Sequence, residues 1–298
     1  MASKILPFDL NETHSYQQWR EWKRSWYPVT VEDLLVPLVD PYSLSAEEKT
    51  AILDRCLKYN LAIYSCGQVK HDISDKNLSR TLSKQLGLTR LDAHLCTDED
   101  DISSLKVASS GKRHQGYIPY TNRAINWHTD GYYNVISKQI HALNLHVVQQ
   151  AASGGENSVM DHEIAYIRLR QENPDYIRAL MEPDVMMIPA NISKEGELIR
   201  PDRYGPVFSI LPDGNLHMRY TARTRSIEWK QDPVVEQAIT LLHDYLHTDS
   251  PYIYRGTLQS GQGLISNNVL HDRAAFTDDD EHKRHYYRAR YFDRIANT

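Results

Sequence analysis

The chain has 298 residues, of which 41% are hydrophobic and 24% are charged, and its formal net charge is -5. This composition is enough for a substantial core, and the acidic balance gives no general attraction to nucleic acid or to an anionic membrane. The first ten residues, MASKILPFDL, hold no apolar run of signal-peptide length, and no stretch of the chain approaches roughly 18 apolar residues. We therefore expect a folded cytoplasmic protein that acts on a small molecule, and we leave open whether it forms a homo-oligomer.

The first helical pattern lies near the start of the chain. The segment SYQQWREWKRSWYP places Trp19, Trp22 and Trp26 at helical spacing, and Pro28 ends the pattern. A stripe of tryptophans at this spacing is typical of a helix that packs its aromatic face against the core. We therefore predict a short structural helix with this aromatic face buried.

A better-marked helix follows, and then a strand and a loop. Ser45 and Glu48 form a capping box, and the helix after it carries three residues on one face, Ile52, Cys56 and Leu57. Residues 61–67, LAIYSCG, predict a strand that a glycine ends. Residues 97–116 run from the acidic TDEDD to the polar VASSGKRHQG and predict a surface loop, a candidate lid.

Strand patterns dominate from residue 117 onward. The segments GYIPYT, AINWHTD and KQIHALNLHVVQQ predict successive strands, and two more are expected at 263–270 and 285–292. Helices are predicted from Asp161, from Pro174 and after the cap Asp232, and the turn at 212–214 predicts a pair of strands. Because no repeat or linker-like stretch appears, we predict one β-rich domain, 1–298, with peripheral helices.

Two His-x-Asp triplets, His128–Asp130 and His247–Asp249, differ in their settings. In a strand, residues i and i+2 project from the same face, so the first triplet, which follows a strand pattern, directs an imidazole and a carboxylate to one point. The second triplet lies where an amphipathic helix ends and the turn DSPY begins, and residues i and i+2 of a helix diverge. The first triplet is therefore the candidate metal site.

A third ligand must come from elsewhere in the sequence. The best candidate is His271, in GLISNNVLHDRAAF, because it too ends an apolar strand pattern. Two histidines and one carboxylate leave about three coordination positions open, an arrangement that suits non-haem Fe(II) oxygenases. A 2-oxo acid co-substrate would need a cation for its far carboxylate, and the strand KRHYYRARYFDR offers Arg284 and Arg288 on one face.

Four motifs in this order, HTD, GGEN, NNVLHDRAAF and RHYYRAR, resemble the taurine dioxygenase (TauD/TfdA) family of Fe(II)- and 2-oxoglutarate-dependent oxygenases. The resemblance covers about residue 117 to the end of the chain. It implies a double-stranded β-helix, or jelly roll, formed by 117–298 with a helical insert, whereas 1–116 would supply helices, strands and the lid loop. It also implies conversion of 2-oxoglutarate and O2 to succinate and CO2, coupled to oxidation of a substrate.

The resemblance assigns roles to individual residues. His128, Asp130 and His271 would be the iron ligands, and Arg288 would pair with the distal carboxylate of 2-oxoglutarate, with Arg284 nearby. Where many members carry GGxT, this chain has GGEN, so Asn157 would replace the threonine that contacts 2-oxoglutarate. Halogenating relatives have a small residue at the position of Asp130, so the carboxylate implies hydroxylation.

The sequence leaves the substrate open between two charges. Tyr132, Tyr133 and Asn134 follow the metal triplet, and a similar aromatic pair in γ-butyrobetaine hydroxylase-like enzymes surrounds a quaternary ammonium. Arg219 and Arg223 would instead suit a carboxylate, sulfonate or phosphonate. Two other functions also stay open, a metal- and 2-oxo-acid-binding sensor without turnover, and a metal-dependent hydrolase.

Overall fold

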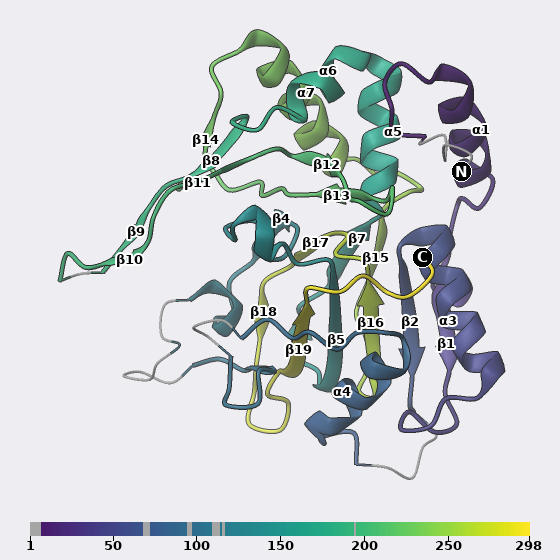
Figure 1. The fold of residues 1–298 in the computed structure, drawn as a ribbon. Coiled ribbons are helices and arrows are strands. Elements are labelled where there is room, and N and C mark those ends of the chain that lie inside the picture. Colours follow the sequence, from purple (N-terminus) through teal and green to yellow (C-terminus); the bar gives the residue numbers. More distant parts are fainter. Residues whose placement is uncertain (1–6, 68–71, 94–96, 109–113, 115–116, 194) are drawn as a thin grey trace. The chain divides into compact units, whose positions relative to one another are not determined.

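The computed structural model describes residues 7–67, 72–93, 97–108, 114, 117–193 and 195–298 (Figure 1). Its contacts divide the chain into two compact units. Unit 1 comprises residues 1–28, 127–139 and 160–253, and unit 2 comprises residues 29–126, 140–159 and 254–298. The prediction that 1–298 forms one domain stays a prediction.

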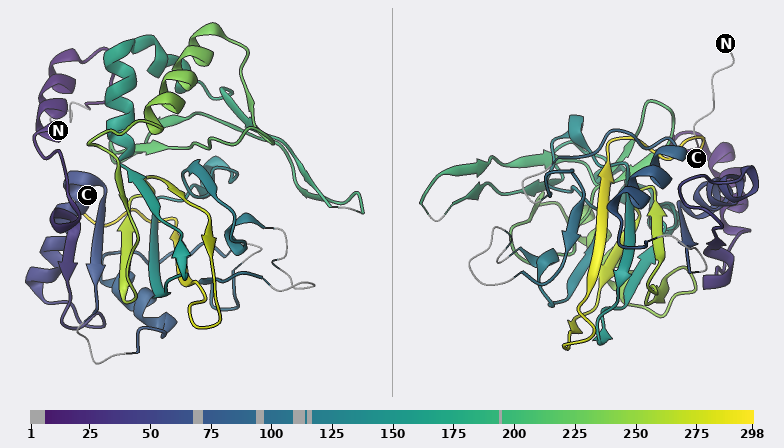
Figure 2. Two further views of the ribbon diagram at one scale, coloured as in Figure 1. Left: turned by 180° about the vertical axis from the view of Figure 1, so that it is seen from behind. Right: turned by 90° about the horizontal axis from the view of Figure 1, so that it is seen from below.

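Unit 2 contains a six-stranded sheet with the order β1-β2-β16-β5-β19-β3 (Figure 2). The central strands β16, β5 and β19 pair antiparallel, whereas β1 runs parallel to β2. The bounds are β1 Leu35–Pro37, β2 Leu61–Ser65, β3 Ser103–Leu105, β5 Ala142–Gln149, β16 Gln262–Ser266 and β19 His285–Tyr291. Strands far apart in the sequence therefore lie side by side, as the predicted jelly roll requires.

A four-stranded sheet has the order β15-β7-β17-β4. Its strands are β4 Ile125–His128, β7 Asn157–Met160, β15 Tyr254–Gly256 and β17 Leu270–Arg273, and the short strands β6 Ser153–Gly154 and β18 Phe276–Thr277 form a separate pair. From β4 to β5 to β7, and again from β15 to β16 to β17 to β19, the chain alternates between the four-stranded and the six-stranded sheet. This alternation is that of a jelly roll, so the predicted fold class is confirmed.

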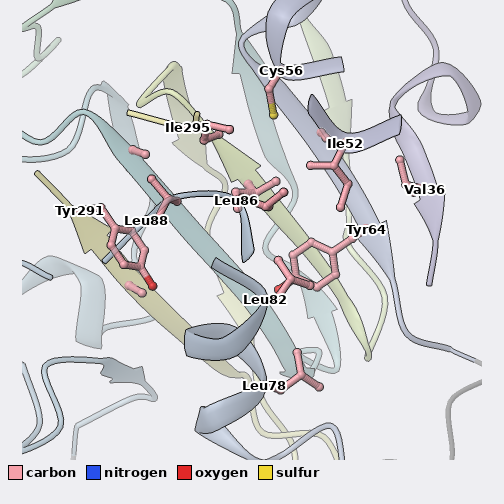
Figure 3. Close-up of a cluster of buried hydrophobic side chains, with 14 of the residues drawn as sticks. Val36, Ile52, Cys56, Tyr64, Leu78, Leu82, Leu86, Leu88, Tyr291 and Ile295 are labelled. Carbon is pink, nitrogen blue, oxygen red and sulfur yellow. The ribbon is translucent and has the colours of Figure 1, made fainter. Parts of the chain in front are cut away.

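Helices pack on the six-stranded sheet of unit 2 around one apolar cluster (Figure 3). The helices of this unit are α2 Val31–Leu34, α3 Ala46–Tyr59 and α4 Lys76–Gln85. The capping box at Ser45 and Glu48 begins α3, and Ile52 and Cys56 are fully buried in the cluster. Leu57, predicted on the same face, is 45% exposed, because it lies one residue past the stripe that packs against the sheet.

Three local predictions in unit 2 are wrong. The predicted loop 97–116 contains β3, whose Ser103 and Leu105 are buried at the sheet edge beside β19; residues 109–113 and 115–116 lie outside the described residues. The predicted strand at 117–121 is a 3-10 helix, Ile118–Tyr120, with a proline at its start. The single strand expected at 263–270 is broken, because Asn268 has φ of 53° and its side-chain amide donates to the carbonyl of Ile140, so β16 and β17 enter different sheets.

Unit 1 is mainly helical around short strands. Its helices are α1 Thr13–Arg24, α5 His162–Glu172, α6 Pro174–Leu180 and α7 Pro233–Leu246, with the 3-10 helix Ile136–Lys138. The predicted caps Asp161 and Asp232 each accept a hydrogen bond from the first turn of their helix. For the described residues, no helix of the chain is long and apolar enough to cross a bilayer.

The buried face of α1 differs from the prediction. Its fully enclosed residue is Lys23, whose ammonium lies 2.6 Å from Asp161 and 2.5 Å from Glu163. Trp19 packs edge-on against Phe8 and Tyr166, but Trp22 is 38% exposed and Trp26 lies beyond the end of the helix. The prediction of three buried tryptophans on this helix was wrong, because the charge pair determines which face of the helix is buried.

The strands of unit 1 form small antiparallel sheets in the insert between β7 and β15. One has the order β11-β8-β14, with β8 Met186–Ile188, β11 Arg203–Gly205 and β14 Glu228–Trp229. The hairpin β12 Phe208–Ile210 and β13 Leu216–Met218 confirms the strand pair predicted around 212–214. A second hairpin, β9 Asn191–Ile192 and β10 Leu198–Arg200, projects from the rest of the unit as an arm (Figures 1 and 2).

Candidate metal centre

The first His-x-Asp triplet lies at the end of β4. Thr129 anchors it in unit 1, since its amide donates to the carbonyl of Tyr220 at 3.0 Å and its hydroxyl accepts from the Tyr220 amide at 3.1 Å. Gly131, with φ of 70°, turns the chain immediately afterwards. The His128 Nε2 and Asp130 Oδ1 atoms lie 3.8 Å apart, and their side chains are only 12% and 5% exposed. The triplet thus presents two donor atoms that are largely shielded from solvent.

His271 supplies the third donor from β17, the neighbour of β4 in the four-stranded sheet. Its Nδ1 atom donates to the carbonyl of Val269 at 2.9 Å, which leaves Nε2 with the lone pair that a metal needs. One donor atom from each of His128, Asp130 and His271 lies within 4.8 Å of the others. Across the described part of the chain, this is the one group of three or more histidine, cysteine or acidic side chains with such spacing. The donor set fits a divalent transition metal with open positions.

The second triplet has the setting that the sequence predicted. Helix α7 ends at Leu246, and His247 is its C-cap residue. The Nδ1 atom of His247 donates to the carbonyl of His243 at 2.7 Å, and the centres of the two imidazole rings lie 4.4 Å apart with their planes tilted by 35°. Neither His247 nor Asp249 belongs to the metal-binding group, so a helix end and a turn account for this triplet.

Arginines gather in unit 2 on β17 and at β19. Arg284 is 4% exposed, and its guanidinium lies 3.7 Å from the centre of the Tyr286 ring. Arg288 lies half-buried in β19, opposite Ser103 of β3 and Leu145 of β5. Arg273 was not predicted, although it lies two residues after His271 and therefore on the same face of β17. Burial, together with the charges of Arg284 and Arg288, lowers the pKa of Arg273 to about 9.

The GGEN segment lies beside these arginines. An added Cβ on Gly155 would come within 3.9 Å of the Arg284 Nε atom, and this Nε atom is buried with no hydrogen-bond partner among the described residues. Asn157 donates from its amide nitrogen to the carbonyl of Asp272 at 2.9 Å, which leaves one N–H of that amide for another acceptor. A buried, incompletely satisfied arginine next to a glycine is suited to a carboxylate.

A comparison with known families identifies the chain. Residues 31–290 match the family model described as "Taurine catabolism dioxygenase TauD, TfdA family". The chain belongs to the TauD/TfdA family. This membership confirms the predicted family.

Similar proteins agree with this placement. A uridine-5'-phosphate dioxygenase from an Amycolatopsis species is 29% identical over 184 residues, which are 60% of this chain and 64% of that relative. The chain thus matches less than two thirds of the relative's length. A putative α-ketoglutarate-dependent taurine dioxygenase from Burkholderia xenovorans has a TM-score of 0.57 at 17% identity, over 87% of this chain and 89% of that one. An asparagine oxygenase in complex with Fe(II), 3-hydroxyasparagine and succinate has a TM-score of 0.58 at 12% identity, over 84% and 80%. These two likenesses show the shared fold.

The segment after the metal triplet has an aromatic pair in this TauD/TfdA-family chain. The Tyr132 ring meets the His128 ring edge-on at 6.4 Å and the Tyr133 ring at 5.2 Å. Asn134 closes the turn, since its amide donates to the Gly131 carbonyl and its side chain to the Lys138 carbonyl. Tyr132 therefore lies next to a candidate iron ligand, whereas the amide nitrogen of Asn134 supports the backbone.

Arg219 has a different environment from the one expected of a substrate ligand. It is 3% exposed, and its guanidinium donates to the backbone carbonyls of four residues, Tyr132, Met186, Arg203 and Gly205. Four of its five N–H groups are therefore occupied, and burial lowers its pKa to about 10. Arg223 is exposed, and its charge acts on the phenol of Tyr132. The sequence shows that both residues are arginines, but it does not show that Arg219 is buried and Arg223 is exposed.

Proposed function

We propose that the protein is an Fe(II)- and 2-oxoglutarate-dependent dioxygenase that hydroxylates a C–H bond of a small acidic metabolite. The observation that carries the proposal is the group of His128, Asp130 and His271, whose donor atoms lie within 4.8 Å of one another. Two imidazoles and one carboxylate hold Fe(II) and leave positions for a chelating co-substrate and O2. When bound, iron with 2-oxoglutarate and O2 supplies the oxidising chemistry, and 2-oxoglutarate becomes succinate and CO2.

The residues of this chain would position the co-substrate. Arg288 is proposed to pair with the distal carboxylate of 2-oxoglutarate, and the buried Arg284 next to Gly155 provides a second cation for the same dicarboxylate. Asn157 keeps one amide N–H for this ligand. The asparagine oxygenase of similar fold contains Fe(II) and succinate, the expected metal and co-product.

Asp130 limits the outcome of the reaction. As the resemblance implies, the carboxylate occupies the ligand position that halogenating relatives leave for a halide, so the product is hydroxylated rather than halogenated. A follow-on cleavage or a desaturation would begin with oxidation of the same C–H bond.

The arginines around Tyr132 support an acidic substrate over a cationic one. Arg200 and Arg223 each interact electrostatically with Tyr132, and Arg203 adds a further positive charge on β11. A quaternary ammonium would be repelled there, whereas an anion would be attracted. The Amycolatopsis relative is described as a uridine-5'-phosphate dioxygenase, and a phosphate monoester is accordingly the acidic group that we propose.

The experiment is a screen for succinate release. Purified protein with Fe(II), ascorbate and labelled 2-oxoglutarate is offered a panel of acidic metabolites that includes uridine 5′-phosphate, and product is scored by mass. We expect succinate to form and one oxygen atom from O2 to enter the product. A His128→Ala variant should lose both turnover and the anaerobic absorbance of the Fe(II)·2-oxoglutarate complex, while the matched His247→Ala variant keeps both.

Three outcomes would contradict the proposal. Absence of the Fe(II)·2-oxoglutarate absorbance and of succinate release in the unmodified protein would sink it outright. Full substrate conversion without O2, or with Zn(II) instead of iron, would favour the hydrolase. An intact absorbance with no conversion of any metabolite in the panel would favour the sensor.

A further inference from the structure

Arg219 brings an arginine-rich part of the insert next to the metal-binding segment, within unit 1. Its guanidinium donates from Nε to the Tyr132 carbonyl at 2.6 Å and from a terminal nitrogen to the Arg203 carbonyl at 2.9 Å. The backbone carbonyls of Tyr132 and Arg203 are therefore held by the same guanidinium. Tyr132 also contacts the His128 ring. Two residues, Arg219 and Tyr132, therefore connect the Arg203 carbonyl to a candidate iron ligand.

Arg200 reaches the same place from the projecting hairpin. Its guanidinium donates to the carbonyls of Pro189 at 2.6 Å and Pro201 at 3.0 Å, and a longer contact of 3.4 Å reaches the carbonyl of Ile188, so two of its five N–H groups stay available. Ile188 is the residue of β8 that pairs with Arg203 of β11. The two arginines thus converge on one strand end, and the positive charge of Arg203 adds to burial in lowering the pKa of Arg200.

The described contacts leave donors on these arginines. The side-chain hydrogen bond described for Arg203 runs from one terminal nitrogen to the Asp202 carbonyl, so most of its five N–H groups can serve a ligand. Arg223, exposed near Tyr132, adds another positive charge. Acidic residues are few here, since residues 200–225 hold five arginines against two aspartates.

We infer that Arg200 and Arg203, together with the phenol of Tyr132, form the subsite for the phosphate monoester of the substrate. This inference rests on the proposed function and names the residues that give it specificity. A phosphate monoester carries close to two negative charges at neutral pH and three acceptor oxygens, and paired guanidinium groups match both properties. Because the Tyr132 ring also contacts the His128 ring, the subsite lies beside the metal-binding segment, with the reacting carbon several bonds from the phosphorus.

The subsite is distinct in sequence from the arginines assigned to 2-oxoglutarate. Those arginines lie on β17 and at β19 of unit 2, whereas Arg200 and Arg203 belong to the insert of unit 1. A member of the family without arginines at these two positions would lack the phosphate preference and keep the co-substrate. The two substitutions are therefore expected to change substrate binding selectively.

The test compares three probes by calorimetry on the full chain loaded with Mn(II) and 2-oxoglutarate under anaerobic conditions. The probes are uridine 5′-phosphate, uridine and inorganic phosphate. The unmodified protein should bind uridine 5′-phosphate at least about tenfold more tightly than uridine, because the phosphate adds charge-assisted hydrogen bonds. Arg203→Gln and Arg200→Gln should each weaken uridine 5′-phosphate by at least about tenfold and leave the affinity for uridine within about twofold.

The matched control is Arg178→Gln. Arg178 is exposed on α6 and pairs with Asp175, so its loss removes one positive charge of the same unit without touching the subsite. It should change none of the three affinities. The inference would be overturned if the unmodified protein bound uridine 5′-phosphate and uridine with equal affinity. It would also be overturned if the Arg203→Gln variant bound both probes with the affinity of the unmodified protein. Binding of the phosphate probes is separate from succinate release, so a failure of the proposed reaction is recognised independently.

Discussion

Arg219 offers the sharpest test of how unit 1 supports the metal-binding segment. We consider Arg219→Met, which keeps the length and apolar stem of the side chain and removes its donors. The guanidinium makes hydrogen bonds of 2.6 to 3.2 Å to four backbone carbonyls from three segments, the turn after Asp130 and strands β8 and β11. Methionine cannot satisfy any of these carbonyls.

The magnitude follows from two opposing effects. Hydrogen bonds to a charged group contribute about 1.5 kcal/mol each at the lower end of their range, so four contribute about 6 kcal/mol. Burial of the guanidinium, which lowers its pKa to about 10 from the ordinary arginine value, costs about 3 kcal/mol. The substitution should therefore reduce the free energy of unfolding by about 3 kcal/mol, within the range seen when a buried charge network is broken.

Equilibrium unfolding in urea measures this difference. The matched control is Arg178→Met, which removes an exposed ion pair with Asp175 and should change the free energy of unfolding by less than about 0.5 kcal/mol. The reasoning would be refuted if Arg219→Met were as stable as this control. We also expect Arg219→Met to weaken iron binding, because the turn that carries Asp130 loses its anchor at the Tyr132 carbonyl.

Three further predictions concern other parts of the chain. Arg288→Gln should raise the 2-oxoglutarate concentration needed for half-maximal Fe(II)·2-oxoglutarate absorbance by at least about tenfold and the iron requirement by much less; equal effects on both would contradict its assignment. Lys23→Met leaves two buried carboxylates without their cation and should cost about 3 to 5 kcal/mol in urea unfolding, and a loss below about 1 kcal/mol would show that the pair is not needed. Burial lowers the pKa of His285 to about 4, so the folded state binds its proton less well than the unfolded state; stability should be complete above pH 6.5 and fall as the pH drops from 6.5 to 4. A His285→Asn variant should flatten this fall in stability, whereas His282→Asn should not, because His282 is exposed. Identical pH profiles for the two variants would contradict the assignment of the fall to His285. The ionisable groups that act on His285 are Lys106, Lys76, Asp98 and His146.

Much of the candidate site could be predicted because it depends on local rules. A strand directs residues i and i+2 to one face, and this rule selected His128 and Asp130 over the pair at 247 and 249, which the structure places at a helix end. His271 was found because a second strand pattern ended in a histidine. Helix caps at Ser45, Asp161 and Asp232 were likewise local, since a side-chain oxygen and the following amides determine them.

The errors arose where a distant contact outweighed the local pattern. The tryptophan stripe of α1 did not decide which face is buried, because Lys23 meets two carboxylates that are more than a hundred residues away in the sequence. The strand expected at 263–270 breaks because the side chain of Asn268 bonds to Ile140. Residues 103–105 look like loop in isolation and become a strand because the edge of β19 is available to them.

The sequence by itself therefore determined the family and the jelly-roll class and selected the candidate metal ligands, since ordered motifs and strand periodicity carry all three. Only the tertiary structure decided what each arginine does, because a guanidinium acts according to the carbonyls and charges around it, and these come from distant segments. Arg219 was predicted to bind substrate and instead holds four backbone carbonyls. The pairing of β8 with β11 places Arg203 opposite Ile188, and Arg219 holds the carbonyls of both Arg203 and Tyr132, a proximity that no motif marks.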